Sequence, residues 1–164
     1  MPSVHDLVLI VCIGAGATAV MDGWLLVLQR LGVPVSNFAL VGRWIGHMAR
    51  GRFAHAAIGK AAAAPREHAI GWLTHYAVGI AFAGVLVAAQ GAEWPRQPSL
   101  LPAVATGLAT VVLPLFVMQP AMGSGFAASK TPAPLKNCLK SVANHAVFGV
   151  GLYLCAAVLV LVMR

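Results

Sequence analysis

Three polar residues, Asp22, His75 and His145, each lie within an apolar run of about twenty residues, long enough for a membrane helix. A carboxylate and two neutral imidazoles form the ligand set of many zinc and non-haem iron sites. Two histidines on different helices could instead hold a haem from both faces, with Asp22 accepting a hydrogen bond from one of them. These residues are therefore the first candidates for a site.

Two other interpretations fit the same three residues. Asp22 could accept a hydrogen bond from His75 or His145 and form a polar cluster without any ligand. The three could also line a path for protons or ions that reaches Asp22 from one side of a membrane. The spacing does not discriminate among these readings, so a transition metal or haem stays open. We expect a binding or accessory protein, and the alternatives are a metal- or haem-binding membrane enzyme or electron carrier and a small transporter or channel subunit.

The composition indicates a membrane protein. Hydrophobic residues make up 60% of the 164 residues and charged residues 9%, and the mean hydropathy is +0.85. Soluble domains carry about 25% charged residues. An apolar helix of about twenty residues crosses a hydrocarbon core of about 30 Å. We predict a single all-α integral membrane domain, 1–164, with transmembrane helices at about 7–28, 70–89, 100–118 and 142–163, the third interrupted by Pro114.

The distribution of positive charge predicts the orientation. The two long connections carry nine of the eleven Lys and Arg residues, namely Arg30, Arg43, Arg50, Arg52, Lys60, Arg66, Lys130, Lys136 and Lys140. Because cytoplasmic loops are enriched in such residues, both connections should be cytoplasmic and both termini outside the cytoplasm. The net charge of +7 is then a signal of topology, and we expect no nucleic-acid partner.

The first connection contains an amphipathic helix at about 37–50. Apolar residues recur there at spacings of three and four, and Ser36 is the expected N-cap. One interpretation places this helix in the membrane interface, with Arg43 near anionic lipid head groups. The other makes it a lid over the cytoplasmic end of the bundle, with His47 pointing inward.

Short matches indicate an internal repeat. Residues 17–20 resemble 109–112, and residues 75–79 resemble 145–149. Because the first and third helices run in one direction and the second and fourth in the other, this is a parallel repeat of two helical hairpins.

Counting along the helices places the candidates at similar depths. His75 and His145 fall about 8 Å inside the cytoplasmic end of their helices, and Asp22 about 12 Å inside its own. Gln119 lies near the same level, and Met122 adds a soft ligand beside it. We therefore predict one polar layer, with Gln119, Met122 and His47 as secondary members.

Small residues mark the helix faces that carry the histidines. Gly71 and Gly79 flank His75 by one turn, and Ser141 and Gly149 flank His145. Such residues let helix backbones approach closely, so these faces should contact other helices. Further small-residue faces lead us to expect a homo-oligomer or a larger membrane complex.

The second connection predicts an anion contact. Glycines 123 and 125 permit unusual backbone angles, and Ser129, Lys130 and Thr131 follow them. A tight re-entrant turn that touches a lipid phosphate is the simpler interpretation. The GxxxxGK[ST] spacing of nucleotide-binding loops does not occur here.

Five segments together resemble a bacterial family of small four-helix inner-membrane proteins classed as a domain of unknown function. They are Val20-Met21-Asp22, Leu40-Val41-Gly42-Arg43-Trp44-Ile45-Gly46-His47, His75-Tyr76-Ala77-Val78-Gly79, Gln119-Pro120-Ala121-Met122-Gly123 and His145-Ala146-Val147-Phe148-Gly149. The resemblance covers nearly the whole chain. It implies the four-helix fold and the inner membrane, and it transfers no catalytic residue.

Overall fold

The computed structural model describes residues 3–163, which contain helices, turns and loops and no strand. Four segments are long and apolar enough to cross a membrane: Val4–Arg30, Glu67–Gln90, Leu100–Met122 and Pro134–Val162. The prediction of an all-α membrane protein with four transmembrane helices is therefore confirmed.

The helices are α1 (Val4–Arg30), α2 (Phe38–Met48), α3 (Glu67–Gln90), α4 (Leu100–Thr110), α5 (Gln119–Met122) and α6 (Pro134–Val162), with short η1 (Ile58–Lys60), η2 (Pro114–Met118) and η3 (Phe126–Ala128). The chain divides into two compact units. We call residues 3–34, 76–110 and 144–163 the helix unit, and residues 35–75 and 111–143 the loop unit.

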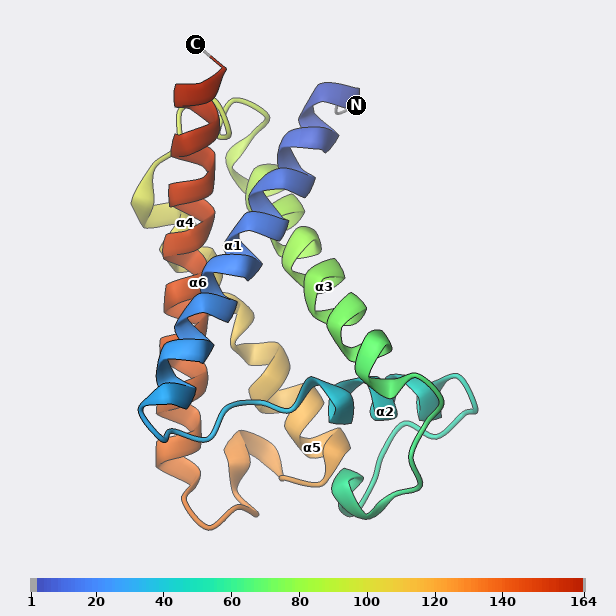
Figure 1. Cartoon of the computed structure of the whole chain (residues 1–164). Coiled ribbons are helices and arrows are strands. Elements are labelled where there is room, and N and C mark those ends of the chain that lie inside the picture. Colours follow the sequence, from blue (N-terminus) through green and yellow to red (C-terminus); the bar gives the residue numbers. More distant parts are fainter. Residues whose placement is uncertain (1–2, 164) are drawn as a thin grey trace. The chain divides into compact units, whose positions relative to one another are not determined.

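The helix unit is a bundle of α1, α4 and most of α3 and α6 (Figure 1). Its core is formed by aliphatic and aromatic side chains from all four helices, among them Ile13 on α1, Leu86 on α3, Ala103 on α4 and Leu152 on α6. The beginning of α1 and the end of α6 lie at the same end of this unit (Figure 1).

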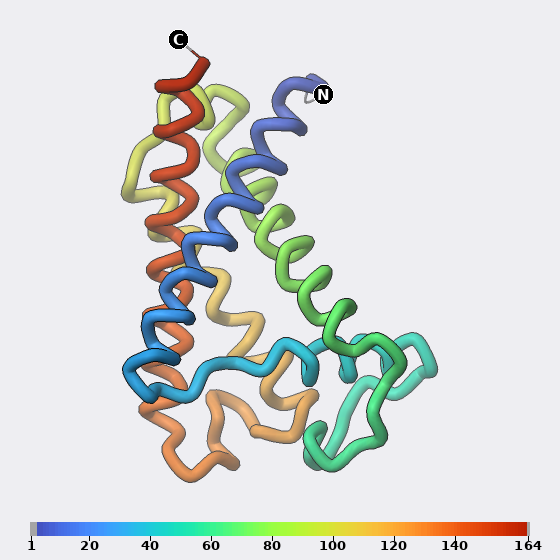
Figure 2. Tube along the Cα trace, viewed as in Figure 1, coloured from blue at the N-terminus to red at the C-terminus, as the bar shows by residue number. Residues whose placement is uncertain are grey.

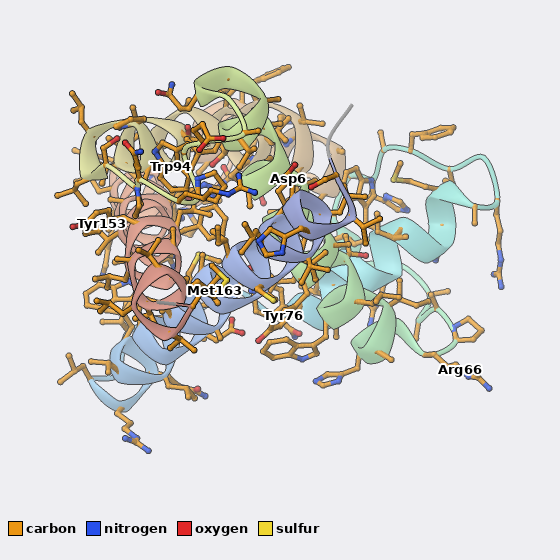
Figure 3. All side chains as sticks on the ribbon, turned by 90° about the horizontal axis from the view of Figure 1, so that it is seen from above. Asp6, Arg66, Tyr76, Trp94, Tyr153 and Met163 are labelled. Atoms are coloured by element: carbon orange, nitrogen blue, oxygen red, sulfur yellow. The ribbon has the colours of Figure 1, made fainter. Side chains whose placement is uncertain are left out.

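At this end the connection between α3 and α4 fastens the start of α1. Ser3 and Asp6 form a reciprocal capping box, and Arg96 donates a hydrogen bond of 2.8 Å from Nη2 to Oδ1 of Asp6. Trp94, on the same connection, is only 5% exposed. Figure 3 looks down on this end of the unit and labels Asp6 and Trp94.

Glycines set the spacing between the helices of this unit. A Cβ atom on Gly14 of α1 would lie 2.5 Å from the Cα of Ile80 on α3. On α6, a Cβ atom on Gly149 would lie 2.8 Å from the Cα of Val104 on α4. Side chains cannot occupy these positions without pushing the backbones apart, which confirms the predicted helix contact at Gly149.

The third span is broken where the sequence predicts an interruption. A turn at Val111 separates α4 from η2, a π-helical segment that begins at Pro114 and continues into α5. Proline has no N–H to donate to the carbonyl of residue 110, so the regular pattern is lost there. The N–H of Gln119 donates to the carbonyl of Pro114 instead, which is the spacing of a π-helix.

Figure 2 shows the course of the loop unit, in which α2 follows an extended segment and precedes a long irregular loop. The cap of α2 differs by one residue from our prediction. Asn37 is the N-cap, because its side chain accepts a hydrogen bond of 3.0 Å from the N–H of Ala39. The helix is then closed by Gly51, whose φ of +76° turns the chain so that the N–H of Arg52 reaches the carbonyl of His47.

Candidate functional site

Asp22 is tied to α3 by a tyrosine. The phenol of Tyr76 donates a hydrogen bond of 2.9 Å to Oδ2 of Asp22. Both side chains are half-buried in the helix unit, and Figure 3 labels Tyr76 beside α1. A charged residue at the centre of a membrane helix costs about 2.5–3.5 kcal/mol on insertion scales, so an oriented carboxylate at this place is a candidate site.

His145 is held by a hydroxyl of α4. The Thr110 Oγ1 lies 2.9 Å from Nδ1 of His145 and 2.7 Å from the carbonyl oxygen of Gly107. A hydroxyl has one proton, which goes to the carbonyl because the carbonyl can only accept. The Thr110 oxygen then accepts from Nδ1–H of His145, and this tautomer makes Nε2 the acceptor or ligand nitrogen.

A third polar contact joins α1 to α6. The indole Nε1 of Trp24 donates a hydrogen bond of 3.0 Å to Oδ1 of Asn144. Trp24 follows Asp22 by two residues, and Asn144 directly precedes His145. The helix unit therefore contains three polar contacts between helices near the candidate residues: Tyr76 to Asp22, His145 to Thr110, and Trp24 to Asn144.

His75 belongs to the loop unit, where its ring stacks on Phe38 of α2. The two ring centroids are 4.1 Å apart with an interplanar angle of 29°, and Trp72 meets His75 edge-on at 5.9 Å. One layer formed by Asp22, His75 and His145 stays a prediction, as does a metal ion held by these three. In residues 3–163, no group of three or more His, Cys, Asp or Glu side chains has an arrangement that could hold a metal ion.

The secondary candidate His47 faces the interior of the loop unit and pairs with a histidine that sequence reasoning did not select. Nδ1 of His47 lies 2.8 Å from Nε2 of His55, and the residues are 6% and 8% exposed. Among the described residues, neither Nδ1 of His55 nor the buried Oε1 of Gln119 has a hydrogen-bond partner. Met122 ends α5, three residues after Gln119.

Burial also changes the acid–base behaviour of this pair. The pKa of His55 lies below its usual value, first because burial disfavours the imidazolium and then because His47 and Arg52 are close. The backbone carbonyl of Ala121 acts on the His55 ring in the opposite direction and raises this pKa, and it is the smallest of the four causes. The neutral form of the His55 ring is therefore favoured at neutral pH.

Arg43, a predicted anion contact, is occupied by protein groups. Its Nε and Nη2 donate hydrogen bonds of 2.8 Å to the two carboxylate oxygens of Glu67, and its Nη1 donates to the carbonyl of Ala61 at 3.0 Å. The hydrogen bond to Glu67 raises the pKa of Arg43 further. This bidentate pair joins α2 to the start of α3, so it has a structural role.

In the second predicted anion contact, formed by Ser129, Lys130 and Thr131, the hydroxyl of Thr131 already makes hydrogen bonds within the protein. Thr131 donates a hydrogen bond of 2.7 Å to the carbonyl of Ala128 and accepts one of 2.9 Å from Asn137. Ser129 and Lys130 are exposed. Binding of an anion by Ser129 and Lys130 stays a prediction, and Thr131 serves the turn before α6.

Comparison with known families extends over almost the whole chain. The family model described as "Protein of unknown function (DUF2938)" matches residues 11–159. The chain belongs to this family. The DUF2938 match includes all three primary candidates, Asp22, His75 and His145, and the predicted resemblance to a domain of unknown function is thereby confirmed. No curated protein and no solved structure matches the chain.

Sequence reasoning missed three residues of this DUF2938 protein that the structure connects to its candidates. Tyr76 and Asn144 adjoin predicted histidines, so a search for hydrogen-bonding side chains one residue from each candidate would have found them. His55 stands in an irregular loop without periodicity. Its only signal in the sequence was a second histidine eight residues after His47.

Proposed function

We propose that this DUF2938 protein is a binding or accessory protein of the bacterial inner membrane, with a cation-binding site centred on Asp22. The observation that carries the proposal is the hydrogen bond from Tyr76, which holds one carboxylate oxygen of Asp22 in place within a membrane-spanning helix. A carboxylate at such a place serves ion or substrate binding more often than structure.

The neighbouring polar contacts support this proposal. The helix unit that contains Asp22 also contains hydrogen-bonding groups from α1, α4 and α6. They form two contacts, Trp24 with Asn144 and Thr110 with His145. Each group is held by its partner, which is what a binding site needs in order to present fixed polar atoms to a ligand.

The test is the thermal stability of protein purified in mild detergent, titrated separately with Na⁺, K⁺, Mg²⁺ and tetramethylammonium chloride. A ligand that binds only the folded state raises the midpoint of unfolding as its concentration increases. We expect at least one of these cations to raise the midpoint of the wild-type protein more than the others do, and Asp22→Asn to remove that difference.

Glu93→Gln is the matched control, because Glu93 is an exposed carboxylate outside the four spans. Its titrations should follow those of the wild-type protein. Equal shifts with all four salts in the wild-type protein, or a cation-specific shift that survives in Asp22→Asn, would remove Asp22 as the binding site.

We further propose that the loop unit faces the cytoplasm and contacts anionic lipid head groups. Six of its cationic side chains are exposed: Arg50, Arg52, Lys60, Arg66, Lys130 and Lys136. Its one acidic residue, Glu67, is paired with Arg43, so no free carboxylate offsets these charges. Exposed cations close to membrane ends favour the cytoplasmic side and attract anionic lipids.

Orientation can be tested by labelling cysteines in intact cells with a reagent that does not cross the membrane. In a background with Cys12, Cys138 and Cys155 replaced, Ser36→Cys should stay unlabelled until the cells are opened. Ser99→Cys, in the connection between α3 and α4, should be labelled from outside. The reverse pattern would overturn the orientation.

Lipid contact can be tested in nanodiscs with a small amount of fluorescent phosphatidylglycerol. The tryptophans of the wild-type protein should transfer energy to the labelled anionic lipid more efficiently than to a labelled phosphatidylcholine. The double variant Arg50→Gln/Arg52→Gln should reduce this difference. Equal transfer to both lipids in the wild-type protein would contradict the proposal.

A further inference from the structure

The His47–His55 pair fastens an irregular segment of the loop unit. We call residues 49–57 the strap. The strap begins where the N–H of Arg52 donates to the carbonyl of His47 at 3.0 Å. It reaches α5 where the N–H of His55 donates to the carbonyl of Ala121 at 2.8 Å. The imidazole contact therefore joins the two residues, His47 and His55, whose backbone groups also attach the strap.

Further contacts hold the strap close to its neighbours. The indole Nε1 of Trp44 donates a hydrogen bond of 2.8 Å to the carbonyl of Phe53. A side chain at Gly123 would collide with the carbonyl of Ala56, so the chain after α5 packs directly on the strap backbone. A change in the imidazole contact would consequently act on a segment that spans α2 and α5.

The distance between the two rings indicates a shared proton. Two nitrogens bound to one tetrahedral zinc ion lie about 3.3 Å apart, because each Zn–N bond is about 2.0–2.1 Å. The observed distance of 2.8 Å is that of a hydrogen bond. One nitrogen must donate and the other must be bare, so the pair accommodates at most one positive charge.

The surroundings disfavour even a single charge on His55. If its Nδ1 carried a proton, that N–H would lie in a buried place where Nδ1 has no partner among the described residues. Burial lowers the pKa of His55 most, His47 and the cationic Arg52 on the strap lower it further, and the carbonyl of Ala121 opposes them more weakly.

Only one acidic group offsets this positive environment. Glu67 at the start of α3 interacts with His47, but its two oxygens also bind Arg43. The sequence of α5, Gln119–Met122, contains no titratable side chain. Protonation of both imidazoles would therefore leave two adjacent cations without a dedicated counterion.

We propose that His47 and His55 form a proton-sensitive latch, which holds the strap on α2 and α5 while the pair is neutral and releases it when both rings are protonated. Acidification below the ordinary histidine range converts a hydrogen bond into a repulsion. Release of the strap would expose the buried Nδ1 of His55 to water. On the proposed orientation, the latch would respond to acidification of the cytoplasm.

The test is amide hydrogen exchange of the full chain in detergent micelles, measured by mass spectrometry at about pH 7.5 and about pH 5.5. Exchange rates are corrected for the intrinsic effect of pH. We expect the corrected rate of the strap amides to rise about tenfold or more at the lower pH, which corresponds to about 1.4 kcal/mol of lost protection. Amides in the middle of α3 should keep their protection.

His55→Gln and His47→Gln each remove one ionisable ring and keep a hydrogen-bonding side chain. In both variants the strap should exchange at nearly the same corrected rate at the two pH values, whatever that rate is. His68→Gln is the matched control, because His68 is an exposed histidine of the same unit, and it should respond to pH as the wild-type protein does.

Two results would overturn the latch. The first is a strap whose corrected exchange in the wild-type protein does not change with pH, and this result requires no histidine variant to fold. The second is the loss of the pH response in His68→Gln combined with its retention in His55→Gln and His47→Gln. Failure of the cation titrations at Asp22 would leave both of these measurements unaffected.

Discussion

Tyr76 on α3 donates its phenolic hydrogen to Asp22 on α1, fifty-four residues earlier in the chain, at a distance of 2.9 Å. The contact links two membrane-spanning helices through an ionisable group. It also makes Tyr76 the residue through which Asp22 can be perturbed without changing the carboxylate itself.

Tyr76→Phe should destabilise the protein by about 0.6–1.7 kcal/mol, the range measured for hydrogen bonds between membrane helices. Unfolding by increasing sodium dodecyl sulfate in mixed micelles measures this change. Tyr153→Phe is the matched control, because the Tyr153 hydroxyl makes no hydrogen bond among the described residues. If the two variants lose equal stability, the Asp22 contact contributes nothing to folding.

Thr110→Val should cost more stability than Thr74→Val. Both hydroxyls donate to a carbonyl of their own helix, but Thr110 also contacts His145 on a neighbouring helix. We expect the difference between the two variants to be about 0.5–1.5 kcal/mol in the same unfolding assay. A double-mutant cycle of Thr110→Val with His145→Gln should give a coupling energy of similar size, and additivity within about 0.3 kcal/mol would argue against the contact.

Gly14→Ala and Gly23→Ala should change stability in opposite directions, although both lie on α1. The new Cβ atom at Gly14 would lie 2.5 Å from the backbone of Ile80, whereas that at Gly23 has no neighbouring atom within 4 Å. Overpacking costs about 1–3 kcal/mol. Replacing glycine in an open helical position gains up to about 1 kcal/mol. Equal effects of the two substitutions would show that α1 and α3 do not approach so closely.

Stability should fall as the pH decreases below about 6.5, the usual pKa of histidine. In the folded protein the pKa of His55 is lowered, so the unfolded chain takes up this proton first. The stabilisation is complete above the unfolded pKa, decreases as the pH falls below it, and levels off below the folded pKa. His55→Gln should flatten this part of the stability profile, and an unchanged slope in that variant would assign the effect to other groups.

The sequence predicted the membrane helices because apolar runs are long and require no knowledge of distant contacts. It predicted the break at Pro114 for the same local reason, the missing N–H. It could not predict the partners of the candidates, since Tyr76 reaches Asp22 and Asn144 reaches Trp24 only after the helices have packed. Periodicity likewise gave no reason to select His55, which lies in a loop whose course depends on α5.

The role of Arg43 illustrates another limit of reading charge from sequence. A cation on an amphipathic helix predicts a contact with lipid, but Glu67, twenty-four residues away, accepts hydrogen bonds from Nε and Nη2 of Arg43. The sequence did contain one signal for this ion pair, because Glu67 is a single acidic residue in a basic region. The internal repeat, in contrast, stays a prediction, although a threonine of α1 and one of α4 each donate to a carbonyl of their own helix.

The contacts of α1 show when its packing can be completed as the chain is synthesised. Asp6 is held by Arg96, which the ribosome adds ninety residues later, and Trp24 is held by Asn144, which follows after a hundred and twenty. These two attachments of α1 therefore form only after the chain has been extended past residues 96 and 144, although Tyr76 on α3 can reach Asp22 earlier. A nascent chain stopped before residue 96 would carry α1 with both of these attachments unmade.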